Sequence, residues 1–268
     1  MNQISHLVIE SHYSPYAIIQ HFDTNGWPSK TRICEKTLYT YIAAGYVPDI
    51  SNKNLLLAGK RRKPRDKPAR HSRAANALRS IDTRPQEIND RSVVGHWEGD
   101  TVYSGKECSP ACLLTLTERK TKAEIVRKIP DRTAKSIKAE FDKMERQMGS
   151  VRFRDLFRSC SFDNGAEFAD TKGLEGSILC LLPRTQLFFA HPYCSSERGT
   201  NENHNGIIRR FISKGCDIGL VNKKTIRETQ DWMNIYSRKI LNGMIPLMKL
   251  KLEMGEGFSI PSFMEVRE

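Results

Sequence analysis

The order of apolar patterns between residues 97 and 240 constrains the fold of this chain more than any other feature. Alternation of apolar and polar residues predicts strands, and apolar residues three and four positions apart predict helices. The region begins with three consecutive strands and then alternates helices with two further strands. This order predicts an α/β domain with a mixed sheet and flanking helices. The predicted strands are 97–103, 111–117, 123–129, 159–162 and 187–190, and the predicted helices include those from 131 onward, from about 200, and from 224 to about 240.

Three acidic residues lie in this pattern where a core residue is not expected. Asp100 is at the centre of the first strand, and Asp163 follows the fourth strand, where an Asn-Gly pair predicts a turn. Glu202 lies in the first turn of a helix, where free N–H groups and the helix dipole favour a carboxylate. A glutamate in a first turn is also common as a solvated capping residue, so the helix alone does not assign it a function.

Four sequence phrases carry these acids in a fixed order. They are GHWEGDTV at 95–102, FDNGAEF at 162–168, FFAHPY at 188–193 and ERGTNENHNGIIRRF at 197–211. On these phrases the chain resembles, from about Tyr13 to Ile240, the DDE transposases of the IS30 kind within the retroviral-integrase superfamily. The resemblance implies a ribonuclease-H-like fold, the integrase catalytic core, which agrees with the predicted order of elements. It also implies a transposase that cleaves phosphodiester bonds at the ends of a mobile DNA element and joins the 3′ ends to target DNA.

By the same resemblance Asp100, Asp163 and Glu202 form a catalytic metal site. Phosphodiester transfer is well served by two Mg²⁺ ions about 4 Å apart, which activate the attacking oxygen and stabilise the leaving one. Magnesium prefers carboxylate oxygens, so a site of acids without thiols suits it, with Mn²⁺ as a possible substitute. The resemblance implies that Asp100 bridges both ions and that the other two acids each hold one.

Other acids near the phrases are alternatives. Glu98 lies two residues before Asp100 and therefore on the same face of the strand. Glu167 and Glu197 are also close to the motifs, but Glu202 is the residue in the Asn-Glu-Asn phrase that carries the family's catalytic glutamate. The 38 residues between Asp163 and Glu202 slightly exceed the family's usual gap, and we expect the excess to form a surface insertion at 170–186.

Positive charge is concentrated in one stretch. The chain has 43 Lys and Arg residues against 31 Asp and Glu, a formal net charge of +12. Ten basic and two acidic residues lie between Lys60 and Arg84, which predicts an arm that follows a polyanion such as duplex DNA, with a solvated linker as the alternative. The predicted DNA-contacting residues are Lys60, Arg61, Arg62, Lys63 and Arg65 in this basic arm, with Arg198, Arg209 and Arg210 beside Glu202.

The N-terminal residues predict two short helices. Ser14-Pro15 is a typical helix start, and a second helix is expected from Glu35 to Ala44. The pair fits a helix-turn-helix with the second helix as the recognition helix, although an ordinary helical hairpin has the same spacing. Relative to IS30-like proteins, a first, more N-terminal helix-turn-helix is not found before this segment.

These patterns divide the chain into four parts: a helix-turn-helix-like segment at 1–50, a basic linker at 51–90, a catalytic domain at 91–250 and a C-terminal tail at 251–268. The seven cysteines are odd in number and lack a C-x-x-C pair, as expected for intracellular thiols rather than a zinc site. No signal sequence or apolar run of about 18 residues is found, so we expect a cytoplasmic, nucleoid-associated protein without a membrane partner.

Departures from the family pattern favour an impaired copy. Ser196 replaces a tryptophan usual before Glu-Arg-Gly, and apolar residues at 241–248 stand where a basic phrase is usual. Two alternative functions therefore remain at this point: a metal-dependent nuclease on the same fold, and a transposase derivative that binds DNA without cleaving it. By resemblance the partners are terminal-repeat and target duplex DNA, bound by a homo-oligomer in a synaptic complex.

Overall fold

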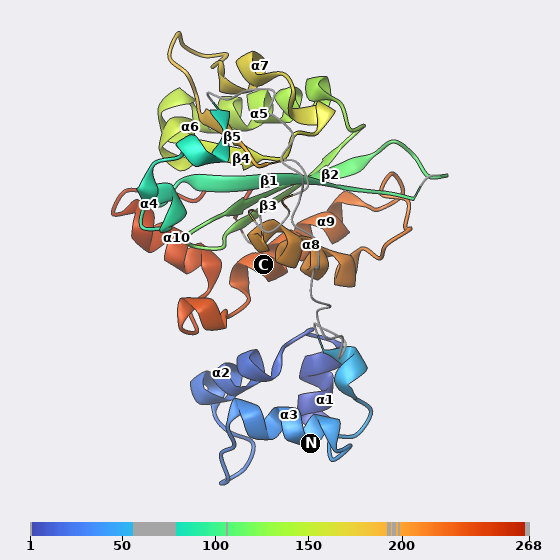
Figure 1. The fold of residues 1–268 in the computed structure, drawn as a ribbon. Coiled ribbons are helices and arrows are strands. Elements are labelled where there is room, and N and C mark those ends of the chain that lie inside the picture. Colours follow the sequence, from blue (N-terminus) through green and yellow to red (C-terminus); the bar gives the residue numbers. More distant parts are fainter. Residues whose placement is uncertain are drawn as a thin grey trace. The chain divides into compact units, whose positions relative to one another are not determined.

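The computed structural model describes residues 2–55, 79–105, 107–191, 194, 197 and 199–265, and they fall into two compact units (Figure 1). The first unit comprises the described residues of Met1–Lys67 together with Tyr236–Ile245. The second comprises the described residues of Pro68–Ile235 and Pro246–Glu268. Among the described residues, no helix is long and apolar enough to cross a membrane.

The first unit is a small helical cluster around Val8, Ile18, Phe22, Leu38 and Ile42. The helix start predicted at Ser14-Pro15 is confirmed, because the Ser14 hydroxyl accepts a hydrogen bond from the Ala17 N–H at 3.3 Å, with Pro15 in the first turn. The helix predicted at 35–44 is present, whereas the helix at 2–9 was not predicted. The helices are α1 (Asn2–Ile9), α2 (Pro15–Asn25) and α3 (Glu35–Ala43), with short 3₁₀ turns at Asn52–Asn54 and Lys239–Leu241.

The second unit is built on a five-stranded mixed sheet with the order β3-β2-β1-β4-β5. The pairs β1–β2 and β2–β3 are antiparallel, whereas β1–β4 and β4–β5 are parallel. This arrangement follows the predicted order of elements, and the mixed sheet expected of a ribonuclease-H-like fold is confirmed. The strands are β1 (His96–Tyr103), β2 (Cys112–Glu118), β3 (Glu124–Ile129), β4 (Ser159–Phe162) and β5 (Gln186–Phe189).

Helices cover both faces of the sheet (Figure 1). Neighbouring residues of a strand point to opposite faces, so Leu114 packs with Phe141 and Phe153 in one core, and Leu113 with Ile208 and Met233 in the other. Every residue of β2 is buried as a result. The first face carries α5 (Ala134–Met148), α6 (Ser150–Leu156) and α7 (Thr171–Glu175), and the second carries α8 (Gly199–Phe211) and α9 (Lys223–Ile235). Helix α10 (Pro246–Met254) contacts α9 and contributes Leu250 to the first core.

The end of the predicted linker is folded onto the second unit. Residues 79–90 contain the 3₁₀ turn Ile81–Thr83 and the short helix α4 (Gln86–Asn89), and both Ile81 and Ile88 are buried. Ser80 forms a bridge to Phe189 in the edge strand β5. Residues 56–78, which include Lys60, Arg61, Arg62, Lys63 and Arg65, lie outside the described part of the chain. The predicted division at 50, 90 and 250 thus stays a prediction.

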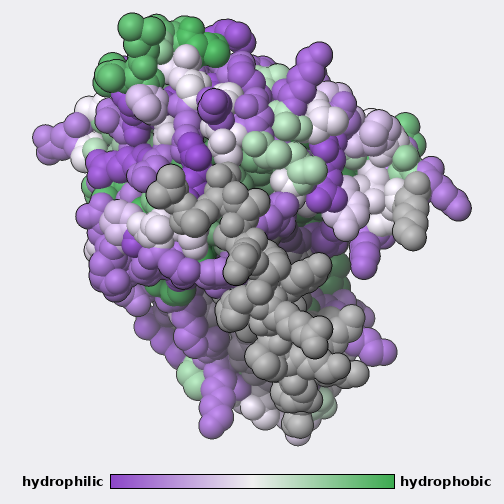
Figure 2. All heavy atoms as spheres, turned by 45° about the horizontal axis from the view of Figure 1, so that its top comes forward, coloured by the Kyte–Doolittle hydropathy of each residue, from purple (hydrophilic) through white to green (hydrophobic). Residues whose placement is uncertain are grey.

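The stretch at 170–186 is more than a surface insertion. Leu174 and Arg184 are fully buried, and the Arg184 Nη1 atom lies 2.7 Å from Asp142 Oδ1 and 3.1 Å from Glu145 Oε2. The tip of the loop is exposed, with Leu181 entirely in solvent. Figure 2 shows one such hydrophobic group at the upper edge of an otherwise mostly hydrophilic face.

A single glycine allows β1 to approach β4. A Cβ atom on Gly99 would lie 2.1 Å from Cε1 of Phe162, whose ring stacks on Phe168 with centroids 4.2 Å apart. We expect Gly99→Ala to lower the free energy of unfolding by about 1–3 kcal/mol, because the buried rings must move to accommodate the methyl group. Urea unfolding followed by circular dichroism measures the change.

The control for this substitution is Gly206→Ala. Gly206 lies inside α8, and apart from its chain neighbours and the backbone of its own helix no heavy atom is within 4 Å of the position of its Cβ. An added methyl group there should stabilise the protein by roughly 0.5–1 kcal/mol. Equal effects of the two substitutions would contradict the close packing of Gly99 on Phe162.

Candidate active site

Asp100 and Asp163 lie at neighbouring positions on two adjacent parallel strands. The register of β1 and β4 pairs Glu98 with Ser161. Asp100 and Asp163 follow these two residues by two positions each. Adjacent strands are about 4.8 Å apart, so the two half-buried carboxylates emerge side by side. The Thr101 N–H donates to Asp100 Oδ1 at 2.8 Å, which fixes that side chain.

The turn after β4 holds Asp163. The Gly165 N–H donates to Asp163 Oδ1 at 3.0 Å, so the aspartate caps the turn predicted from Asn164-Gly165. Asn164 Nδ2 donates to the carbonyl of Ala190, directly after β5, at 2.7 Å. The turn is thereby tied to the next strand, and its backbone orients the carboxylate.

Asn205 connects α8 to Asp100. Its Nδ2 donates to Asp100 Oδ2 at 2.8 Å, and its Oδ1 accepts from the Thr115 hydroxyl at 3.3 Å. Glu202 lies three residues earlier on the same side of α8 and is exposed, as the helical pattern predicts. The helix therefore presents Glu202 on the side that faces Asp100.

A second contact holds α8 against the sheet. His204 Nδ1 lies 2.7 Å from Glu124 Oε2, which also accepts from the Thr117 hydroxyl at 2.7 Å. All three side chains are buried. Together with Asn205, these contacts fix the rotation of α8 about its axis.

The three predicted ligands are not drawn together into one closed set. Among the described residues, no group of three or more His, Cys, Asp or Glu side chains lies close enough to hold a metal ion. The structure places Asp100 and Asp163 on neighbouring strands and Glu202 on the helix that contacts Asp100. Their oxygen donors suit Mg²⁺ or Mn²⁺.

The alternative acids each stabilise the surrounding structure. Glu98 is buried in an ion pair with Arg119, and Glu197 accepts from the His191 N–H at 2.8 Å while contacting its ring Nδ1 at 2.8 Å. Glu167 accepts from the Thr101 hydroxyl at 3.0 Å and from Arg132 Nε at 2.6 Å. Burial raises the pKa of Glu167, but the bonds from Arg132 and Thr101 outweigh it, and its pKa lies below the ordinary value.

The predicted basic contacts have different outcomes. Arg209 donates from Nη2 to the carbonyl of Tyr103 at 2.7 Å, so its guanidinium holds the end of β1 to α8, and burial lowers its pKa. Arg210 lies in the last turn of α8 and is half-buried. Arg198 and Ser196 lie outside the described residues. A DNA contact by any of these residues stays a prediction.

Sequence reasoning missed the residues that orient the acids. Asn205 belongs to the same phrase as Glu202, and its spacing of three residues was the available signal. Arg91 Nη2 donates to the Thr200 hydroxyl at 3.4 Å, and Arg84 Nη1 to the Ser161 hydroxyl at 3.3 Å. Both arginines come from residues assigned to the linker or its border, so their contacts with α8 and β4 required the three-dimensional structure.

Comparison with known proteins finds transposases of insertion sequences among the relatives of this chain. The chain is 35% identical over 205 residues to the "probable transposase for insertion-like sequence element IS1161" of Streptococcus salivarius, covering 76% of this chain and 55% of that protein. It is 33% identical over 172 residues to the transposase for insertion sequence element IS1086 of Cupriavidus metallidurans, covering 64% and 47%. It is 28% identical over 166 residues to the transposase InsI for insertion sequence element IS30A of Escherichia coli, covering 62% and 40%.

The chain thus spans about half the length of these curated relatives. No family model matches it. Among solved structures, it is similar to the HTLV-2 integrase catalytic core domain in complex with magnesium, with 17% sequence identity and a TM-score of 0.44. That similarity covers 59% of this chain and 98% of the viral one.

The burial of His96, in the first motif, predicts that the folded protein loses stability at acid pH. Burial, with Arg158 and other nearby cations, lowers the pKa of His96 from 6.5 to about 4. The unfolded chain then binds more protons than the folded protein between these two values, so stability falls as the pH drops through this window. We expect the free energy of unfolding to fall by roughly 1–2 kcal/mol through this group between pH 7 and pH 5.

Urea unfolding of wild type and His96→Gln at the two pH values tests this prediction. The variant should lose less stability than wild type on acidification, whatever its stability at pH 7. His21→Gln, in the first unit, is the control and should keep the wild-type difference. A His96→Gln protein with the full wild-type difference would refute the assignment.

Proposed function

We propose, on the premise that this chain belongs to the insertion-sequence transposases that include those of IS30, that it cleaves DNA at element ends and joins the 3′ ends to target DNA. The observation that carries the proposal is the placement of Asp100, Asp163 and Glu202. Asp100 and Asp163 follow paired residues of two adjacent strands, and Glu202 lies on the helix that is bonded to Asp100. The sequence phrases on which the family resemblance rests, GHWEGDTV and FDNGAEF and the phrase around Glu202, carry these three acids.

The metal ligands in this proposal are Asp100, Asp163 and Glu202. Mg²⁺, or Mn²⁺ in its place, would supply Lewis-acid activation of water or of a 3′ hydroxyl and would offset the charge of the phosphate. Asn205 and the Thr101 N–H orient the Asp100 carboxylate, and the Gly165 N–H orients that of Asp163. Since Glu202 is exposed, its side chain has room to turn toward the two aspartates when a cation is present.

The remaining parts of the chain have proposed roles in DNA binding. The helices α2 and α3 would read duplex DNA, and the basic arm would follow its phosphates. The partners proposed are terminal-repeat and target DNA, bound by a homo-oligomer. The high content of basic residues, 43 against 31 acidic ones, supports a polyanionic partner.

A second candidate is a derivative that binds DNA without cleaving it. One observation favours it: in the described part of the chain the three carboxylates do not form a closed ligand set. The predicted replacement of basic residues at 241–248 is partly explained by packing, because Leu247 contacts the core next to the buried Leu250. A metal-dependent nuclease on the same fold would cleave without joining.

Substitution of the acids tests the catalytic assignment. Asp100→Asn, Asp163→Asn and Glu202→Gln should each lower Mg²⁺-dependent cleavage of terminal-repeat DNA by more than about 100-fold, because each removes a metal ligand. DNA affinity should change little, since no positive charge is removed. Gel assays of cleavage and of strand joining on the same labelled ends measure both steps.

Glu197→Gln is the matched control for Glu202→Gln, because it makes the same chemical change at a glutamate that lies six residues after His191 and accepts a hydrogen bond from it. We expect it to retain cleavage within about tenfold, as a residue that holds structure would. Cleavage by the Glu202→Gln protein at the wild-type rate would contradict the assignment of Glu202 as a metal ligand. Cleavage without joining would identify a nuclease, and end-specific binding without cleavage would identify the DNA-binding derivative.

Neutralisation of the basic arm tests its role in DNA binding. Replacing Lys60, Arg61, Arg62, Lys63 and Arg65 by Gln should flatten the slope of log affinity against log salt by roughly 0.9 for each phosphate that the arm no longer neutralises. Sequence preference should stay the same, because phosphate contacts position a protein without specifying bases. Fluorescence anisotropy with terminal-repeat and random duplexes measures both quantities, and an unchanged slope would show that the arm is a spacer.

A further inference from the structure

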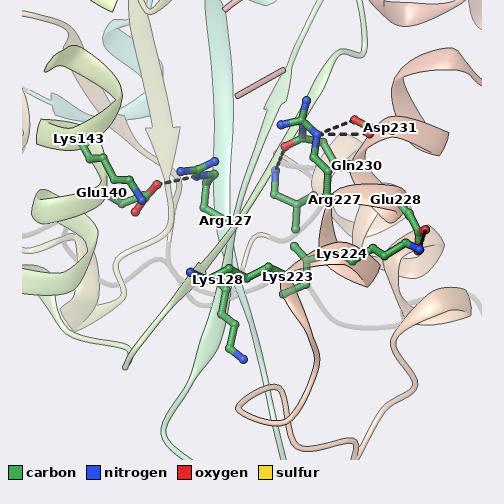
Figure 3. Close-up of a pocket in the computed structure, with 12 residues that line it drawn as sticks. Arg127, Lys128, Glu140, Lys143, Lys223, Lys224, Arg227, Glu228, Gln230 and Asp231 are labelled. Carbon is green, nitrogen blue, oxygen red and sulfur yellow. Dashed lines mark hydrogen bonds and ion pairs between the residues drawn. The ribbon is translucent and has the colours of Figure 1, made fainter. Parts of the chain in front are cut away.

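A cavity of about 580 Å³ opens beside the edge strand β3 (Figure 3). It extends around the strand, since Arg127 lies toward Glu140 of α5 whereas Ile226 and Gln230 belong to α9. The buried side chains of Val126 and Ile226 contribute apolar surface, and charged residues supply most of the remaining lining. Cavities of roughly 300–1,000 Å³ accommodate small ligands.

Positive charge predominates in this cavity. Its basic side chains outnumber its acidic ones by six to three. Lys143 and Lys223 are exposed, and in the described part of the chain neither takes part in an ion pair. The charged lining consists of Arg127, Lys128, Lys143, Lys223, Lys224 and Arg227, with Glu140, Glu228 and Asp231.

Two arginines of the cavity are held by carboxylates through their Nε atoms. Arg127 uses Nε to bind Glu140 Oε1 at 2.5 Å, and Arg227 uses Nε to bind Asp231 Oδ1 at 3.0 Å (Figure 3). The Nη atoms of Arg227 reach the carbonyl of Ser262 only at 3.4 Å. A guanidinium with five donors, fixed through Nε, can still bind two phosphate oxygens through its Nη atoms.

The cavity is separate from the candidate active site. Thr115 of β2 pairs with Asp100 of β1 on one side and with Val126 of β3 on the other. At about 4.8 Å per strand, the backbone of Val126 is roughly 10 Å from that of Asp100. The acids emerge at the β1–β4 pair, whereas the cavity lies beyond the opposite edge of the sheet.

We propose that this cavity binds a phosphate group, carried either by a nucleotide or by a nucleic-acid backbone. Arg127 and Arg227 would bind the phosphate oxygens directly, and Lys143 and Lys223 would add charge at the rim. The proposal does not depend on metal binding or cleavage by the three acids, so it can hold where the proposed function fails.

The test uses the full chain in EDTA, so that no divalent cation bridges a phosphate to the acids. Calorimetry measures the affinity for ATP, and anisotropy measures the affinity for a labelled random 20-base-pair duplex. Lys143→Gln/Lys223→Gln removes two charges from residues without ion pairs and should weaken one or both affinities by about tenfold or more. The control Lys172→Gln/Lys251→Gln removes the same charge from exposed lysines outside the cavity.

A third variant separates geometry from charge. Arg227→Lys keeps the charge but loses paired donation, so it should also weaken phosphate binding. A selective loss of ATP affinity in the cavity variants identifies a nucleotide as the source of the phosphate, and a selective loss of DNA affinity identifies a nucleic-acid backbone. Equal effects of the cavity and control pairs, no effect of the cavity pair, or a change in oligomeric state alone would overturn the proposal.

Discussion

The contact between Gly99 and the Phe162 ring is the constraint on which the arrangement of the acids depends. Each of these residues directly precedes an aspartate, so the packing of a glycine under a ring sets the distance and register of Asp100 and Asp163. Phe162 is itself fixed by its stacking on Phe168. A buried aromatic cluster in the core thereby determines the position of two polar groups at its border.

Buried charged residues hold the same region together, although their desolvation costs free energy. Glu118 is fully buried, and it accepts hydrogen bonds from the backbone N–H groups of Gly95, His96 and Lys120, although burial raises its pKa. Arg119 forms the ion pair with Glu98, and its Nε also donates to the carbonyl of Ile88 at 3.2 Å. Buried ion pairs contribute little net stability, because desolvation offsets their attraction. What they supply here is a fixed geometry, since Glu118 and Arg119 meet their partners only when β1, β2 and α4 come together in one arrangement.

The sequence predicted those strands and helices whose apolar residues recur at a regular spacing. All five strands were found because alternating residues pack into one of the two cores, and α8 was found because Ile207 and Ile208 mark its buried face. The helices α6 and α10 were missed, as were the folded residues 79–90, where Ile81 and Ile88 are too few to form a pattern. Arg184 lies in the stretch predicted to be a surface insertion, and only its contacts with Asp142 and Glu145 explain its burial. Among the site residues, the role of Asn205 could not be read from its type, because an asparagine acquires that role only where a helix meets a strand.

The position of α9 follows from the need to cover the edge strand β3. An uncovered edge exposes N–H and C=O groups to other chains. Gln230 Oε1 accepts from the Val126 N–H at 2.9 Å, and Asn234 Oδ1 accepts from the Glu124 N–H at 2.8 Å. The two amides are four residues apart on the helix, a rise of about 6 Å, and their targets are two residues apart on the strand, about 6.7 Å, so the repeats match. One period further, the helix supplies Ile226 opposite Lys128 and has no amide to offer. Lys128 instead directs its Nζ to the carbonyl of Gly219 at 2.6 Å. The cavity opens at this end of β3, where the amide side chains of α9 no longer cover the edge strand.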